Sequence, residues 1–124
     1  MRFIAIANPD IAPYGAAAVE VLEKQNLWHQ LQPKIVRAEN VNAAKQLAAT
    51  GNAEAAFTAY SLVLKERGQT ILIEESLHSP IDQELGIVAS SQQPERARRF
   101  ANFVLGEQGR TILTRFGYAF PPSP

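Results

Sequence analysis

The sequence predicts an α/β fold, an open and mostly parallel sheet covered by helices. Three short strand-like runs, at residues 3–7, 34–37 and 55–59, alternate with two segments in which apolar residues recur at helical spacing. Such alternation is typical of a parallel sheet, and the uninterrupted apolar character of the first run is typical of a strand covered on both faces. Because the crossovers in such sheets are right-handed, the carboxyl ends of the strands gather on one edge with the starts of the following helices. Ligands bind at that edge in open α/β sheets.

The turn between the first strand and the first helix is the most informative stretch. Pro9 and Pro13 stiffen it, and Pro13 stands at or just before the first position of a helix that runs to Lys24, where a missing N–H costs nothing. The N–H groups expected to lack a partner within that helix are those of Tyr14, Gly15 and Ala16. Together with the helix dipole they favour an anion, and Gly15 lets another group approach closely. In isolation, the same stretch also fits an ordinary βα turn.

A second strand-to-helix turn is built in the same way. Asn40 is a good N-cap, and Gly51 is a fitting end for the helix. The apolar stripe between them consists of Val41, Ala44, Leu47 and Ala48. The third strand, 55–59, then leads into the Ala59–Tyr60 pair. The first turns of both helices and this pair are therefore expected at the ligand-binding edge of the sheet.

The rest of the chain is less regular. Strands are predicted at Thr70–Ile73 and Leu85–Ala89. A helix that opens at Pro94 is expected to bend at Gly106 or Gly109.

Composition excludes several classes of function. The 124 residues form one domain at most, and 12 basic and 12 acidic residues leave no net charge and no basic face for nucleic acid. Without cysteine there is no disulfide or thiolate chemistry, and two histidines without ligand spacing predict no metal site. No apolar run approaches the roughly 20 residues that cross a bilayer, and no signal peptide precedes the first strand. No nucleophile–base pair is visible, so binding is expected rather than enzymatic catalysis.

Four stretches resemble the periplasmic molybdate-binding proteins of ABC importers. They are Ala5–Gly15 followed by an alanine-rich helix, Lys34–Val41, Thr50–Ala55 and Gly109–Tyr118. The likeness covers nearly the whole chain in the right order, and it implies one lobe of a type II periplasmic binding protein. Residues 1–84 would be the second, ligand-binding lobe, residues 85–120 a returning strand with the C-terminal helices, and residues 121–124 a frayed tail.

The resemblance also implies a binding site. In this family a tetrahedral oxyanion is clamped between two lobes by uncharged donors, and here the N–H groups of Tyr14 and Val41 would be the donors, with Gly15 beside the first. Some members use a tyrosine hydroxyl at the end of the third strand, where this chain has Ala59 followed by Tyr60. The implied ligand is molybdate or tungstate, and no cofactor is implied.

The implied partner is an ABC permease and the implied location is the periplasm. Because the family's first lobe is absent, apolar surface from about Leu85 onward is expected to be uncovered, which predicts a homo-oligomer, with exchange of the C-terminal segment as one route. A second hypothesis is a structural or interaction fragment that oligomerises but binds no anion. It predicts no thermal shift with any tetrahedral oxyanion.

Overall fold

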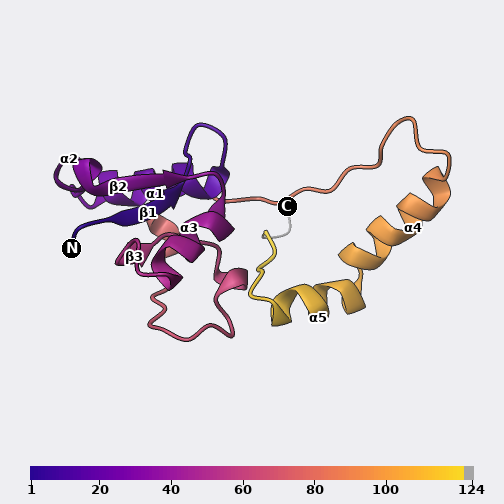
Figure 1. Cartoon of the computed structure of the whole chain (residues 1–124). Helices are drawn as coiled ribbons and strands as arrows, with labels where there is room; N and C mark the ends of the chain where they lie inside the picture. The colour runs from indigo at the N-terminus through magenta and orange to yellow at the C-terminus, as the bar shows by residue number, and fades with distance from the viewer. Residues whose placement is uncertain (122–124) are drawn as a thin grey trace. The chain divides into compact units, whose positions relative to one another are not determined.

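The chain divides into two compact units between Ile81 and Asp82 (Figure 1). The computed structural model describes residues 1–121, so residues 122–124 of the predicted tail lie outside the described residues. The predicted ranges of the ligand-binding lobe and of the returning segment stay predictions.

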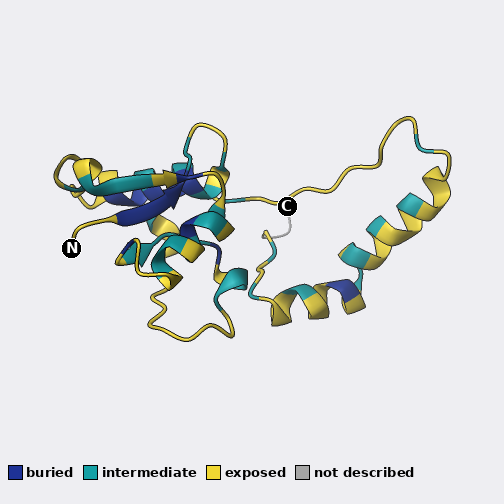
Figure 2. Cartoon of the chain, viewed as in Figure 1, coloured by how far each residue is buried: buried dark blue, intermediate teal, exposed yellow. Residues whose placement is uncertain are grey.

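The first unit contains a three-stranded parallel sheet, which confirms the predicted fold class. Its strands are β1 (Ile4–Ala7), β2 (Ile35–Ala38) and β3 (Ala55–Ala56), in the order β2-β1-β3. The register pairs Ala7 with Ala38, so β1 and β2 end level with one another. All four residues of β1 are buried, although successive side chains point to opposite faces. Both faces of this central strand are therefore covered (Figure 2).

Helices follow each of the first two strands. The α-helices of this unit are α1 (Pro13–Lys24), α2 (Trp28–Leu31) and α3 (Val41–Ala49), and the short 3₁₀ helices are η1 (Gln32–Lys34), η2 (Tyr60–Leu62) and η3 (Glu75–Leu77). As predicted, Pro13 opens α1 and Asn40 caps α3. Both α1 and α3 contact β1, which explains why the central strand is buried on both sides.

The core of this unit is made largely of alanine. Its central cluster consists of Ala5, Ala38, Ala44 and Ala53, with Leu47 packed against it. Small side chains let α3 lie close to the sheet, but each removes little apolar area from water, at about 25 cal/mol per Å². We therefore expect modest stability, to which helix caps and backbone packing contribute a large share.

The stretch after η2 returns to α1 and is held there by two polar contacts. The ammonium of Lys24 donates to the carbonyl oxygen of Ser76 at 3.2 Å. The backbone N–H of Ser79 donates to the carboxylate of Glu20 at 2.6 Å and holds the pKa of that carboxyl below its ordinary value. Glu20 and Lys24 lie one helical turn apart, so a single face of α1 anchors the end of the first unit.

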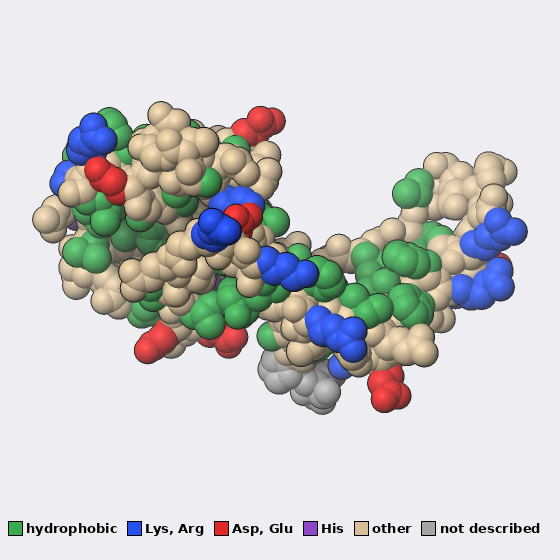
Figure 3. All heavy atoms as spheres, turned by 60° about the horizontal axis from the view of Figure 1, so that its bottom comes forward, with side chains coloured by type: hydrophobic (Ala, Val, Ile, Leu, Met, Phe, Trp, Pro, Cys, Tyr) green, Lys and Arg blue, Asp and Glu red, His purple; other side chains and the backbone are tan. Residues whose placement is uncertain are grey.

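Two predicted strands are wrong. Thr70–Ile73 and Leu85–Ala89 run without regular structure, and their apolar side chains face water, with Ile71 73% and Val88 69% exposed. A strand forms only when a neighbouring strand supplies ladder hydrogen bonds, and no strand pairs with either segment in residues 1–121. A composition rich in β-branched residues is therefore not sufficient to form a strand in these two segments. Figure 3 shows hydrophobic side chains at the surface of the chain.

The second unit contains two helices, α4 (Pro94–Leu105) and α5 (Glu107–Arg115). The predicted bend occurs at Gly106, which caps α4 and opens α5. Gly109 lets α5 pack on the end of α4, because a Cβ there would lie 2.3 Å from the carbonyl oxygens of Phe103 and Val104. In the part of the chain that the structure describes, no helix is long and apolar enough to span a membrane.

Candidate functional site

The turn from β1 into α1 is fixed by Asn8. Its backbone N–H donates to the carbonyl oxygen of Ala38 at 2.8 Å, which ties the turn to the end of β2. Its own carbonyl oxygen accepts from the N–H groups of Ile11 and Ala12, at 3.2 and 2.8 Å. Its side-chain oxygen accepts from the N–H of Asp10 at 3.1 Å. One asparagine therefore sets where α1 begins relative to β1 and β2.

The first turn of α1 differs in part from the prediction. The N–H groups of Gly15 and Ala16 were expected to lack partners in the helix, but both donate to the carbonyl oxygen of Ala12, at 3.0 and 3.1 Å. The capping residue Ala12 is extended, which directs its carbonyl oxygen along the new helix. These two amides are thus used by the helix itself. Tyr14 stands at the second position of α1, and the role of its amide as a ligand donor stays a prediction.

Gly15 is buried between α1 and the end of β1. A Cβ at this position would lie 2.0 Å from the carbonyl oxygen of Ala7 and 3.0 Å from the nitrogen of Pro9. The group that approaches Gly15 closely is therefore the chain's own strand end. In the structure, Gly15 allows the first turn of α1 to pack closely against the end of β1. A direct contact between Gly15 and a ligand stays a prediction.

The start of α3 is capped as the sequence indicates. The side-chain oxygen of Asn40 accepts from the N–H of Ala43 at 2.9 Å, and its carbonyl oxygen accepts from the N–H of Ala44 at 3.0 Å. Val41, the first helical residue, is half-buried. A hydrogen bond from the hydroxyl of Thr58 reaches the carbonyl oxygen of Val41 at 3.0 Å. This bond ties the segment after β3 to the first turn of α3.

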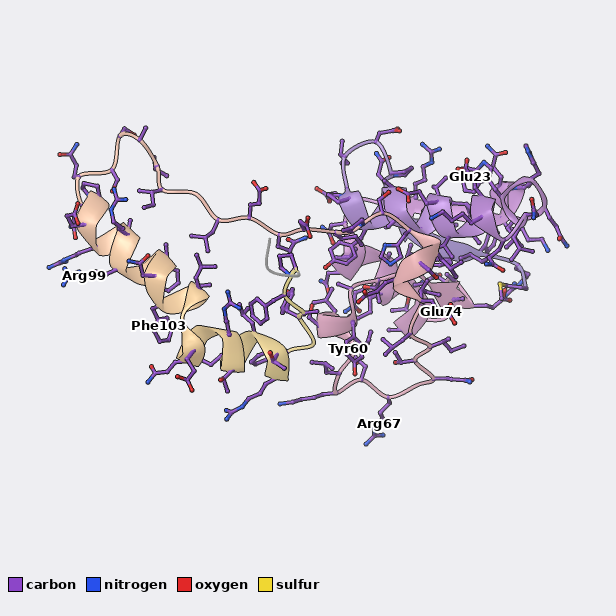
Figure 4. The ribbon with its side chains drawn as sticks, turned by 180° about the vertical axis from the view of Figure 1, so that it is seen from behind. Glu23, Tyr60, Arg67, Glu74, Arg99 and Phe103 are labelled. Atoms are coloured by element: carbon purple, nitrogen blue, oxygen red, sulfur yellow. The ribbon has the colours of Figure 1, made fainter. Side chains whose placement is uncertain are left out.

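The third predicted contact lies in that segment. Ala59 is 5% exposed and caps η2, whereas Tyr60 is 42% exposed and opens η2. Tyr60 therefore belongs to a helical turn and not to a strand (Figure 4). The N–H of Phe57 donates to the carbonyl oxygen of Ala5 at 2.9 Å, so the chain continues beside β1 for one residue past β3 before it turns.

Sequence reasoning missed the side chains that hold this loop. The ammonium of Lys45, on α3, lies 2.7 Å from a carboxylate oxygen of Glu66 and 3.5 Å from the carbonyl oxygen of Leu62. Together with Thr58, it connects the loop that contains η2 to two successive turns of α3. Leu62 and Glu66 follow Lys45 by 17 and 21 residues in the sequence, so a local sequence pattern does not predict these contacts.

The donors predicted for the candidate site are neutral backbone groups. An ion pair joins Asp10, in the turn after β1, to Arg37 of β2 at 3.4 Å, and both side chains are at least half exposed. Among the described residues no group of three His, Cys, Asp or Glu could hold a metal ion. Two shallow hollows on the surface are lined by residues 92–96 and by residues of α5, and not by candidate residues. The use of these backbone N–H groups as donors to an anion stays a prediction.

Comparison with known proteins identifies the family. The sequence model described as "Bacterial extracellular solute-binding protein" matches residues 1–119. The chain is 35% identical over 119 residues to the molybdate-binding protein ModA of Rhodobacter capsulatus, a match that covers 95% of this chain and 47% of that protein. It is 34% identical over 121 residues to ModA of Azotobacter vinelandii, which covers 94% and 48%.

A solved structure agrees with these matches. The periplasmic molybdate-binding protein of Azotobacter vinelandii superposes with a TM-score of 0.88 at 31% identity, over 98% of this chain and 55% of that chain. The chain thus spans about half the length of the curated relatives it matches. The resemblance seen in four stretches of the sequence is confirmed. The chain belongs to the family of bacterial extracellular solute-binding proteins.

Proposed function

We propose that this chain is part of the solute-binding component of a molybdate or tungstate ABC importer, and that it holds one side of a tetrahedral oxyanion. Backbone N–H groups in the first turns of α1 and α3, those of Tyr14 and Val41, donate to the anion. The Ala59–Tyr60 segment supplies a third contact, and Gly15 keeps the first turn of α1 in place.

The observation that carries this proposal is the adjacency of the two helix starts. Ala7 and Ala38 pair in register, and the helices that follow them begin at Pro13 and Val41. Two helix N-termini at one edge add their partial positive charges, which favours a dianion without any charged side chain. The strand order also reverses at β1, and ligands bind at such a reversal in open α/β sheets.

The relatives support the choice of ligand and partner. Two of them are molybdate-binding proteins, and the similar solved structure is that of a periplasmic molybdate-binding protein. Neutral donors suit a receptor, because a bound anion that forms no ion pair can be released to a permease. The proposed location is therefore the periplasm, the proposed partner an ABC permease, and the proposed role reversible binding without catalysis.

The test is a calorimetric titration with molybdate of the parent chain and of two variants at one position. Tyr14→Pro removes the backbone N–H, and proline is tolerated in the first turn of a helix. Tyr14→Phe keeps the backbone N–H and removes only the side-chain hydroxyl. A hydrogen bond to a charged group contributes about 1.5–3 kcal/mol, so Tyr14→Pro should bind molybdate at least about tenfold more weakly. Tyr14→Phe should bind like the parent.

Equal affinity of Tyr14→Pro and the parent chain would refute the amide-donor mechanism. Sulfate serves as the second ligand. Equal affinity for sulfate and molybdate would show that the site does not select the larger anion, molybdate.

A second function is favoured by one observation. Ile71, Leu72 and Val88 are 73%, 64% and 69% exposed, which is unusual for side chains of this size. The chain would then be an interaction fragment that oligomerises and binds no anion. Oligomers whose melting temperature is unchanged by molybdate, tungstate and sulfate would favour this function over the first.

A further inference from the structure

Lys45, on α3, is a lysine that water hardly reaches. Its side chain is only 17% exposed. A lysine is seldom covered to this extent unless its ammonium is paired, because removing a charge from water without a partner is costly. Here the ammonium has two partners, the carboxylate of Glu66 at 2.7 Å and the carbonyl oxygen of Leu62 at 3.5 Å. The side chain of Lys45 therefore holds the loop that follows β3.

One of these partners, Leu62, is the last residue of η2. A cation beside the last carbonyl oxygens of a helix is favourable, because those oxygens carry a partial negative charge. Two hydrogen bonds close η2. The N–H of Leu62 donates to the carbonyl oxygen of Ala59 at 3.0 Å, and the N–H of Val63 donates to that of Tyr60 at 3.1 Å. So short a helix is not stable by itself, and its position depends on contacts from outside.

The segment just before η2 is tied to the same face of α3. The hydroxyl of Thr58 donates to the carbonyl oxygen of Val41 at 3.0 Å, and Val41 lies one helical turn before Lys45. Both ties act on the Ala59–Tyr60 segment, which is the proposed third contact for the anion. Figure 4 labels Tyr60 at the start of η2. The ties also connect this segment to Val41, whose N–H is the second proposed donor.

We propose that Lys45 is a positioning residue of the anion site. Its ammonium fixes η2 against α3 and so holds the Ala59–Tyr60 segment beside the donor at Val41. Lys45 acts through η2 and does not contact the anion. A binding group that is already held in place has less freedom to lose when the ligand arrives, which raises affinity. This inference rests on the proposed function, because it concerns the affinity of the same site.

The first measurement is a calorimetric titration of the full chain with molybdate. Lys45→Met keeps an unbranched apolar stem and removes the ammonium. It should weaken molybdate binding by about fivefold or more, which is the usual size of coupling between two places in one protein. Lys45→Arg keeps a charged donor and should regain most of the affinity. Lys65→Met is the matched control, because Lys65 is an exposed lysine of the same loop. It should bind like the parent.

Glu66→Ala separates a lost tie from a changed charge. This variant removes the carboxylate that pairs with Lys45 and makes the chain more positive. If Lys45 acted only by attracting the anion, Glu66→Ala would bind molybdate more tightly than the parent. If the pair holds η2, the variant binds more weakly, as Lys45→Met does. Weaker binding is the result that we expect.

Amide hydrogen exchange tests the tie without any anion. The N–H groups of Leu62 and Val63 report the opening of η2, and Lys45→Met should speed their exchange by about fivefold or more. The N–H of Phe57, which donates to the carbonyl oxygen of Ala5 beside β1, is the internal reference and should exchange as in the parent. A variant that only lowers the overall stability would speed all three amides together.

Three results would overturn the role of Lys45 while leaving the proposed function in place. They are unchanged exchange at Leu62 and Val63 in Lys45→Met, tighter molybdate binding by Glu66→Ala, and faster exchange in η2 with unchanged affinity. The last result would show that η2 lies outside the site. A parent chain that binds no molybdate would instead refute the proposed function, and the role of Lys45 in affinity with it.

Discussion

Gly15→Ala is the substitution for which the structure makes the sharpest prediction. The added methyl carbon would stand 2.0 Å from the carbonyl oxygen of Ala7 and 2.7 Å from its carbonyl carbon. To reach an ordinary contact, α1 must withdraw from β1 by roughly 1 Å. The obstacle is backbone, which cannot turn aside as a side chain can. Overpacking costs about 1–3 kcal/mol, and the upper end applies here.

The gain in helix propensity offsets part of this loss. Alanine is favoured over glycine in a helix by about 1 kcal/mol, which leaves a net loss of about 2 kcal/mol. For a domain of this size each kcal/mol lowers the melting temperature by about 4–8 °C, so a decrease of about 8–16 °C is expected. Thermal denaturation followed by far-UV circular dichroism measures it.

Gly86→Ala is the matched control. A Cβ at Gly86 meets nothing within 4 Å, so this variant should stay within about 0.5 kcal/mol of the parent. If Gly15→Ala melts at the temperature of the parent, α1 does not lie as close to the end of β1 as described here.

Three further substitutions test the caps and ties around the site. Asn40→Ala removes the cap of α3 and should cost about 1 kcal/mol in thermal denaturation, whereas Asn40→Asp should not; equal losses would exclude the cap. Thr58→Val removes the hydrogen bond to Val41 and should cost about 1 kcal/mol, with Thr58→Ser as the control that retains it. Glu20 has a pKa below its ordinary 4.5, chiefly because the N–H of Ser79 donates to it. Its contribution to stability is therefore present above pH 4.5 and is lost as pH falls through the lowered pKa. Urea unfolding at several pH values should show the parent more stable than Glu20→Gln at neutral pH, with the difference shrinking in acid; a difference that does not depend on pH would contradict this assignment.

Short sequence patterns correctly predicted the starts of α1 and α3 and the buried strand β1, because these features depend on residues close together in the sequence. Pro13 marks the start of α1 because proline fits the first helical position, and Asn40 marks the start of α3 because its side chain can accept a backbone N–H. The uninterrupted apolar run of β1 predicted a strand covered on both faces. Together with the alternation of strand-like and helical runs, these features predicted the parallel sheet, while its ligand-binding edge stays a prediction.

Features that depend on distant partners could not be predicted in the same way. Thr70–Ile73 has the composition of a strand, but a strand also needs a neighbour, and composition does not report one. Gly15 was singled out for the close approach of a ligand, which stays a prediction, and only the folded chain shows that Ala7 approaches it. The pairing of Lys45 with Glu66 likewise depends on where the loop after β3 passes over α3.

Oxyanion binding at the two helix starts is tested most directly by nuclear magnetic resonance. Molybdate is titrated into the ¹⁵N-labelled 124-residue chain, with sulfate as the comparison. We predict that the largest chemical-shift changes occur at the amides of Tyr14 and Val41, that they saturate together, and that sulfate produces smaller ones. Changes centred on other amides, or none at millimolar molybdate, would contradict the proposed site.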